Sequence, residues 1–102
     1  MKLLAGEDES TELYARLYWN VVYHFKGILF SATKADWPTM RAGLLSMIKK
    51  YPDPRNINAL GSFACMAGDV ATMRDAIRKL DTHVAVEIWA NIMPYERCAG
   101  PL

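Results

Sequence analysis

An internal repeat is the feature of this sequence that most restricts its fold. The segment DWPTMR at residues 36–41 recurs as DVATMR at residues 69–74, an offset of 33 positions. A period of this length with helical spacing is typical of helix-turn-helix repeats, which stack because one unit cannot bury its own apolar face. The sequence therefore predicts an all-α fold of two stacked helical hairpins plus a short C-terminal closing helix. The same offset pairs further apolar residues: Phe30 with Phe63, Leu44 with Ile77, and Met47 with Leu80.

Length and composition indicate one ordinary globular domain. The 102 residues allow a single modest core, so residues 1–102 are predicted to form one helical-repeat domain. The formal net charge is +1, and no Lys/Arg stripe interleaves with aromatic residues, so no nucleic-acid partner is predicted. Asn20, His24 and Lys26 interrupt the longest apolar stretches, so no membrane partner is predicted either.

The N-terminal region favours a cytoplasmic location, and this location in turn sets the expected state of the cysteines. The apolar run Leu3-Leu4-Ala5 is too short for the apolar region of a signal peptide, and acidic residues follow it closely. Cytoplasmic cysteines stay reduced, so Cys65 and Cys98 are predicted to be free thiols. Cys65 is expected inside a helix, and Cys98 in an exposed tail.

Apolar spacing divides the chain into helices, and capping residues mark where they begin and end. Asp36 and Asp69 are expected to be N-caps, because a carboxylate there accepts from free backbone N–H groups. Gly68 is expected to be a left-handed C-cap. Residues 1–9 and 95–102 are expected to be flexible. The predicted helices cover about residues 10–33, 36–50, 55–67 and 69–80, with a shorter closing helix within 83–93.

The second copy of this pattern resembles the tetratricopeptide repeat. The order Leu60-Gly61, Gly68-Asp69, Ile77 and Leu80 is similar to the Leu-Gly pair, the Gly-Asp turn and the large apolar positions of that family. The first copy departs from the family, since it lacks the Leu-Gly pair and has Ala35 where the turn glycine would be. The sequence LYARLYW…LF…DWPTMRAG…YPDPRNIN…FACMAGD is also similar to an uncharacterised bacterial family of helical-repeat character. These resemblances imply a fold, but no activity.

No catalytic, cofactor-binding or metal-binding constellation is predicted. His24 and His83 belong to no HxxxH, CxxC or CxxH spacing, so no local metal motif exists. A Cys–His nucleophilic pair would need an orienting group and an oxyanion donor, and nothing in the sequence marks them. Because Asp36 and Asp69 recur in the repeat, they are interpreted as caps and not as an acid/base pair.

Three polar residues are candidates for binding a partner. Arg41 and Arg74 recur in the repeat and can line one groove that meets a partner's carboxylate, or can cover the next unit with their aliphatic stems. Asn58 lies near the position where some tetratricopeptide grooves hold a peptide backbone, so the resemblance implies a role in binding.

The aromatic residues of the first helix are candidates for a dimer interface. Tyr14, Tyr18, Trp19 and Tyr23 extend its apolar arc beyond the roughly 100° stripe that one neighbouring hairpin covers. Aromatic residues concentrate at interfaces, although core packing explains them equally well. A homodimer in solution is expected on this basis.

Taken together, these features favour a non-catalytic protein-interaction module that binds another protein or a peptide. The alternative is a small stoichiometric binder, such as an immunity-type or inhibitory protein, which blocks a folded target. An enzyme whose site is not visible in the sequence is the third hypothesis. A net charge near zero favours the first hypothesis over the second.

Overall fold

The computed structural model describes residues 6–25, 29–33 and 35–99. No residue in these ranges forms a β-strand, so the described chain is all-helical, as predicted. The helices are α1 (Gly6–Val21), α2 (Leu29–Ala32), α3 (Trp37–Lys50), α4 (Pro54–Ala67), α5 (Val70–Leu80), α6 (Val86–Ala90) and α7 (Tyr95–Ala99), with the 3₁₀ turns η1 (Val22–His24) and η2 (Asp81–His83).

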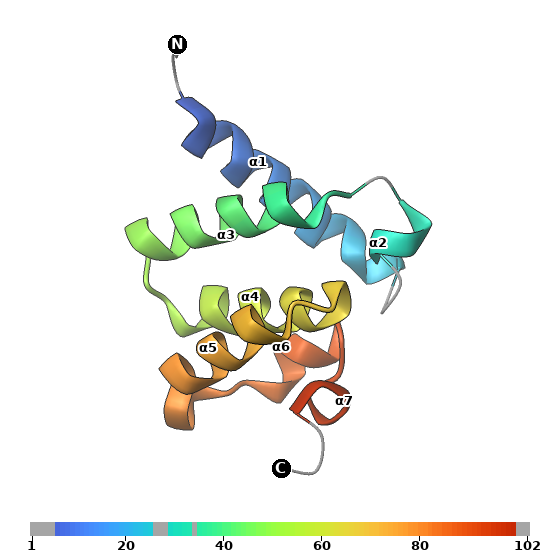
Figure 1. Ribbon diagram of the computed structural model, residues 1–102, viewed down its shortest axis with the longest axis vertical. Helices are drawn as coiled ribbons and strands as arrows, with labels where there is room; N and C mark the ends of the chain where they lie inside the picture. Colours follow the sequence, from blue (N-terminus) through green and yellow to red (C-terminus); the bar gives the residue numbers. More distant parts are fainter. Residues whose placement is uncertain (1–5, 26–28, 34, 100–102) are drawn as a thin grey trace.

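The long helices follow one another along the longest axis of the molecule, from the N-terminal end to the C-terminal end (Figure 1). Helix α1 packs mainly on α3, and α4 packs mainly on α5, while contacts between α3 and α4 join the two pairs. The short helices α6 and α7 pack on α4. The chain therefore forms two helical pairs with two short helices against the second pair.

Both copies of the repeated segment begin a helix in the same way. The Asp36 carboxylate accepts from the backbone N–H of Thr39 at 3.0 Å, and the Asp69 carboxylate accepts from that of Thr72 at 3.1 Å. In each copy the threonine hydroxyl also donates to the aspartate at 2.6 Å. Gly68 ends α4 in the left-handed conformation, with φ at 84°, which a residue without Cβ adopts at little cost. The predicted caps are confirmed.

Side chains of the first copy hold the cap of the second copy. The indole N–H of Trp37 donates to Asp69 at 3.0 Å, and the guanidinium Nε of Arg41 donates to the Thr72 hydroxyl at 3.0 Å. The same Nε lies 3.7 Å from the Asp69 carboxylate. These hydrogen bonds fix the start of α5 against the start of α3.

The main core lies where α1, α3 and α4 meet, and it contains Leu44, Met47 and Phe63 of the apolar pairs in the repeat. Leu44 and Phe63 are fully buried, and Leu80 of α5 is buried outside this cluster. A second cluster, formed by Ala64, Met73 and Trp89, continues the core toward α7. The prediction that Leu44 and Phe63 are core residues is confirmed.

The first predicted helix is wrong in its extent. It starts four residues earlier, at Gly6, and it ends at Val21, where η1 follows. Phe25 then leaves the helical conformation, and the next described helix, α2, begins at Leu29. Val22 and Leu29 are both fully buried. One straight helix with apolar residues on all sides would not necessarily bury both of them, so the break at Phe25 allows the core to cover both. The sequence also allows a kink or an earlier stop at Gly27, which lies outside the described residues.

The C-terminal region also differs from prediction. The closing helix lies within residues 83–93, as predicted, and spans only Val86–Ala90, but residues 95–99 form α7 in place of the predicted tail. The Tyr95 ring packs edge-on against Trp89, with centroids 4.9 Å apart, and Ala99 is buried. Because α7 gains these apolar contacts, the segment folds back onto the domain.

The two cysteines form a disulfide, so the prediction of free thiols is wrong. Cys65 of α4 and Cys98 of α7 are bonded, with their Cα atoms 5.7 Å apart. Helix α7 brings Cys98 back to α4, which linear spacing does not reveal. The bond counts against the cytoplasmic location from which free thiols are predicted, since disulfides persist mainly in oxidising compartments. Among the described residues, no helix has the length and apolar character needed to cross a membrane.

Candidate partner-binding groove

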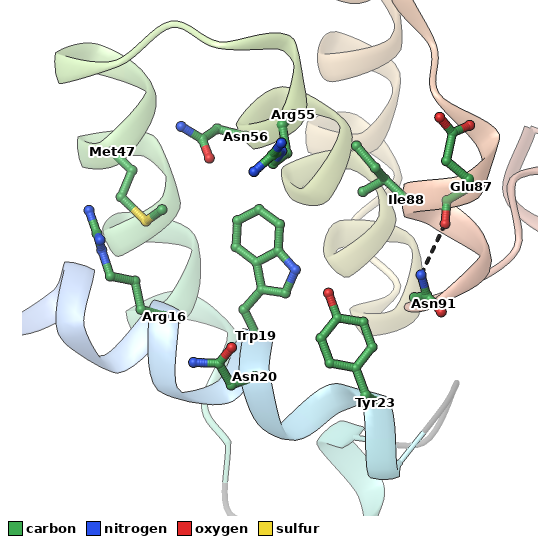
Figure 2. Close-up of a pocket in the computed structure, with 10 residues that line it drawn as sticks. All are labelled: Arg16, Trp19, Asn20, Tyr23, Met47, Arg55, Asn56, Glu87, Ile88 and Asn91. Carbon is green, nitrogen blue, oxygen red and sulfur yellow. Dashed lines mark hydrogen bonds between the residues drawn. The ribbon is translucent and has the colours of Figure 1, made fainter.

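A groove of about 560 Å³ lies between the end of α1, the start of α4, and α6 (Figure 2). We call it the α1–α6 groove. Side chains enter it from α1 and η1 on one side, from α3 and α4 on a second, and from α6 on a third. Its described lining consists of Arg16, Trp19, Asn20, Tyr23, Met47, Arg55, Asn56, Glu87, Ile88 and Asn91.

Aromatic and apolar side chains form the floor of this groove. Trp19 and Tyr23 lie four positions apart, so both point to the same side of the chain, and their rings enter the groove together (Figure 2). The Trp19 ring packs edge-on against Phe63, with centroids 6.4 Å apart, which anchors it to the core. Tyr23 is 47% exposed. The groove therefore has one fixed aromatic ring and one accessible ring.

Polar groups surround these rings. The Asn56 amide nitrogen donates to the Tyr51 carbonyl at 3.1 Å, and that of Asn91 donates to the Glu87 carbonyl at 3.2 Å. Each bond holds the amide by its nitrogen and so fixes the orientation of the side chain. Within the described residues, Arg16 and Arg55 form no ion pair. Two cations and several amides are thus available around an apolar floor.

The arrangement suits binding better than covalent chemistry. Among the described lining residues Glu87 is the only acid, and no serine, cysteine or histidine stands beside it as a nucleophile or base. In the part of the chain that the structure describes, no three His, Cys, Asp or Glu side chains come close enough together to hold a metal ion. The groove instead offers aromatic, guanidinium and amide groups, which recognise peptides.

Asn58 does not lie at a binding surface. Only 1% of it is exposed, and both atoms of its amide are used inside the protein. Its nitrogen donates to the carbonyls of Pro54 and His83, and its oxygen accepts from the N–H of Ala85 and from the Trp89 indole. The prediction that it binds a peptide is therefore corrected: Asn58 joins α4 to the segment that leads into α6.

Arg41 and Arg74 do not share one groove. Arg41 is bound to Thr72 and Asp69, so it serves the contact between the two copies, which corresponds to the alternative that it covers the next unit. Arg74 is exposed and lines a different hollow, between α5 and α7. It makes no ion pair with the described residues.

The aromatic residues of the predicted dimer interface are mostly occupied within the chain. The Tyr14 hydroxyl accepts from the Asp36 N–H at 2.9 Å, and its ring contacts that of Tyr18, with centroids 4.9 Å apart. Trp19 and Tyr23 line the α1–α6 groove instead. The most exposed apolar residues of α1 are Leu13 and Leu17, at 70% and 56%. Self-association remains a prediction.

The buried carboxylate of Glu12, in α1, is balanced by an ion pair and a hydrogen bond. Glu12 is buried, and the Lys50 ammonium lies 2.8 Å from its carboxylate, which also accepts from the Ser46 hydroxyl. These partners, Lys50 above all, hold the pKa of Glu12 below its ordinary value. The Thr72 hydroxyl and the Trp37 indole likewise lower the pKa of Asp69. Both carboxylates act as structural acceptors and stay ionised near neutral pH.

Sequence reasoning missed most of the groove. Arg16 and Asn20 appear in the sequence only as the polar strip of the first helix. Asn56 and Arg55 begin the third predicted helix without any distinguishing motif. The available signal was the interleaving of Arg16 and Asn20 with Trp19 and Tyr23 at helical spacing, which places polar and aromatic groups side by side.

In comparisons of this chain with protein families, with curated proteins and with solved structures, no match was found.

Proposed function

We propose that this protein is a non-catalytic interaction module that binds a segment of another protein in the α1–α6 groove. The observation that carries the proposal is the pairing of an accessible aromatic floor with two guanidinium groups, Arg16 and Arg55, that form no ion pair with the described residues. We further propose that the two helical pairs form a short repeat array of the tetratricopeptide type. The matching Asp36 and Asp69 caps, and the bonds from Trp37 and Arg41 to the second cap, support that arrangement.

The lining indicates the chemistry of the bound segment. An aromatic or branched apolar side chain would pack on Trp19 and Tyr23, where apolar area is removed from water. A nearby carboxylate would pair with Arg16 or Arg55, because a guanidinium binds a carboxylate through two parallel hydrogen bonds. The Asn56 and Asn91 side-chain oxygens can accept from a peptide backbone. We therefore expect a short segment that combines an acidic residue with a bulky apolar residue.

Panning a phage-displayed library of random dodecapeptides against the full chain tests this proposal. Enriched peptides should contain Asp or Glu close to an aromatic or aliphatic residue, and fluorescence polarisation should measure their affinity. Arg16→Glu and Arg55→Glu should each weaken binding by at least about tenfold, which corresponds to about 1.4 kcal/mol. Tyr23→Ala should weaken it similarly.

Arg78→Glu is the matched control, because Arg78 is an exposed arginine of α5 outside the groove. It should leave the affinity unchanged, and circular dichroism should show every variant to be folded. Peptides that bind equally well to the Arg16→Glu and wild-type proteins would place recognition elsewhere. Failure to enrich any peptide would favour the alternative, a blocker that recognises only a folded target.

A further inference from the structure

A second groove, of about 400 Å³, lies between α5 and α7, and its described lining shares no residue with that of the α1–α6 groove. We call it the α5–α7 groove. Its described lining consists of Cys65, Val70, Met73, Arg74, Ile77, Arg97, Cys98 and Ala99. Both cysteines of the disulfide are partly exposed and line the groove, so a small solute in it lies next to the bond.

Two arginines give this groove a positive charge. Arg74 of α5 and Arg97 of α7 are exposed, and neither forms an ion pair with the described residues. The described lining contains no Asp or Glu, and Asp75 and Glu96 lie outside it. An anionic solute is therefore attracted to the groove that contains the disulfide.

Thiol–disulfide exchange is the reaction that this arrangement favours. The attacking species is a thiolate, and the displaced sulfur also leaves as a thiolate. A nearby guanidinium stabilises negative sulfur, and it also raises the local concentration of an anionic thiol. A disulfide enclosed in an apolar core has neither the charge nor the access. The α5–α7 groove provides both.

Hydrogen bonds hold the segment that leads into α7 independently of the disulfide. The Met93 N–H donates to the Ser62 hydroxyl at 2.9 Å, and that hydroxyl donates to the Met93 carbonyl at 2.9 Å. These bonds join α4 to the residues just before α7. The end of α7 therefore stays close to α4 when the disulfide is broken, so the bond can form again.

We propose that the Cys65–Cys98 disulfide is a reversible S-thiolation site for a low-molecular-weight thiol that carries a carboxylate. The carboxylate would pair with Arg74 or Arg97, and the carbon chain of the thiol would lie against Ile77. A groove of about 400 Å³ has room for such a small molecule. This inference goes beyond the proposed function, because it assigns covalent chemistry to a separate surface.

The exchange replaces one disulfide by another. The thiolate of the small molecule attacks Sγ of Cys98, the bond to Cys65 breaks, and the electron pair of that bond leaves with the Cys65 sulfur. A mixed disulfide forms on Cys98, and the Cys65 thiolate takes a proton from water. Cys98 is the sulfur attacked, because it follows Arg97 directly and belongs to a helix of only five residues, whereas Cys65 lies within the longer α4. Attack by Cys65 on the mixed disulfide reverses the step.

Three thiols that share a two-carbon chain test the proposal: 3-mercaptopropionate, 2-mercaptoethanol and cysteamine. Their thiolates are a dianion, a monoanion and a zwitterion. Each is added in excess to the full disulfide-bonded chain at low ionic strength. Samples are quenched with acid at intervals, and mass spectrometry follows the loss of the disulfide-bonded form. Peptide mapping of early samples locates the mixed disulfide, which should be on Cys98.

Arg74→Glu should slow exchange with the dianion at least about tenfold more than exchange with the zwitterion, because the repulsion grows with the charge of the thiolate. Arg97→Glu should act in the same direction. Comparing each thiol with itself across the variants cancels differences in intrinsic nucleophilicity. Circular dichroism should show every variant to be folded.

Lys49→Glu is the matched control, because it makes the same change of net charge at an exposed position of α3 outside both described linings. It should change the rates with the three thiols by the same factor. Added salt should reduce the difference that Arg74→Glu makes between the dianion and the zwitterion.

Three results would overturn the proposal. The first is that the folded protein does not exchange with any of the three thiols. The second is that Arg74→Glu and Arg97→Glu change all three rates equally, which a merely structural role of the arginines would produce. The third is a mixed disulfide that forms on Cys65 and not on Cys98.

Discussion

Asn58 shows how one buried polar side chain connects segments that are distant in sequence. It links α4 to the carbonyl of His83, to the N–H of Ala85 and to the indole of Trp89. Its own helix supplies the fourth partner, the Pro54 carbonyl. All these groups are buried or half-buried, and an unsatisfied polar group in such a place costs about 1–3 kcal/mol. The position of α6 therefore depends on this amide.

Asn58→Leu should lower the free energy of unfolding by about 3 kcal/mol, because it leaves the Trp89 indole and the Ala85 N–H without an acceptor. Urea denaturation with the disulfide intact measures the change. Asn56→Ala is the control: its amide is only partly buried and donates one bond, to Tyr51, so its cost should stay near about 1 kcal/mol. Equal losses for the two variants would contradict the role given to Asn58.

At the scale of the elements, α1 and α3 pack with their backbones in close approach. A Cβ placed on Gly43 would lie 2.0 Å from the carbonyl oxygen of Thr11, a distance that only movement of the α1 backbone would relieve. Gly43 therefore allows the two helices to touch, and the ion pair of Glu12 with Lys50 lies beside this contact on the same helices. The position of α1, and with it that of Trp19 in the α1–α6 groove, depends on this approach.

Gly43→Ala should destabilise the protein by about 1–3 kcal/mol, because the added methyl group overpacks the contact between α1 and α3. Helix propensity alone predicts the opposite sign, a gain of up to about 1 kcal/mol for alanine. Ala42→Gly, at the exposed neighbouring position, should cost about 1 kcal/mol through propensity only. Chemical denaturation decides, and a Gly43→Ala protein more stable than wild type would show that α1 lies further from α3.

At the scale of the whole molecule, the disulfide ties the C-terminal segment to the middle of the chain. It closes a loop with a sequence separation of 33, which contains the whole of α5 and α6. Cross-linking a loop of this length lowers the entropy of the unfolded chain and stabilises the fold by about 3–4 kcal/mol in the loop-closure description. For a small domain this is a large part of the total stability.

Reduction of the disulfide should therefore lower the melting temperature substantially, and Cys98→Ser should lower the free energy of unfolding by about 3–4 kcal/mol in urea melts. Dithiothreitol should shift the wild-type transition and leave that of the Cys98→Ser protein unchanged. A wild-type transition that does not move on reduction would mean that packing of α7 on α4 is sufficient without the bond.

The sequence by itself determined the local structure of this protein. The aspartates before α3 and α5, the glycine after α4 and the spacing of residues such as Leu44 and Phe63 act within a helical turn or two, so they can be read along the chain. Tertiary structure alone decided what depends on distant neighbours. The polar pattern does not tell buried Asn58 from exposed Asn20, and cysteine spacing does not show that α7 returns Cys98 to Cys65. Both grooves are features that the tertiary structure decided, because their walls come from helices that only packing brings together.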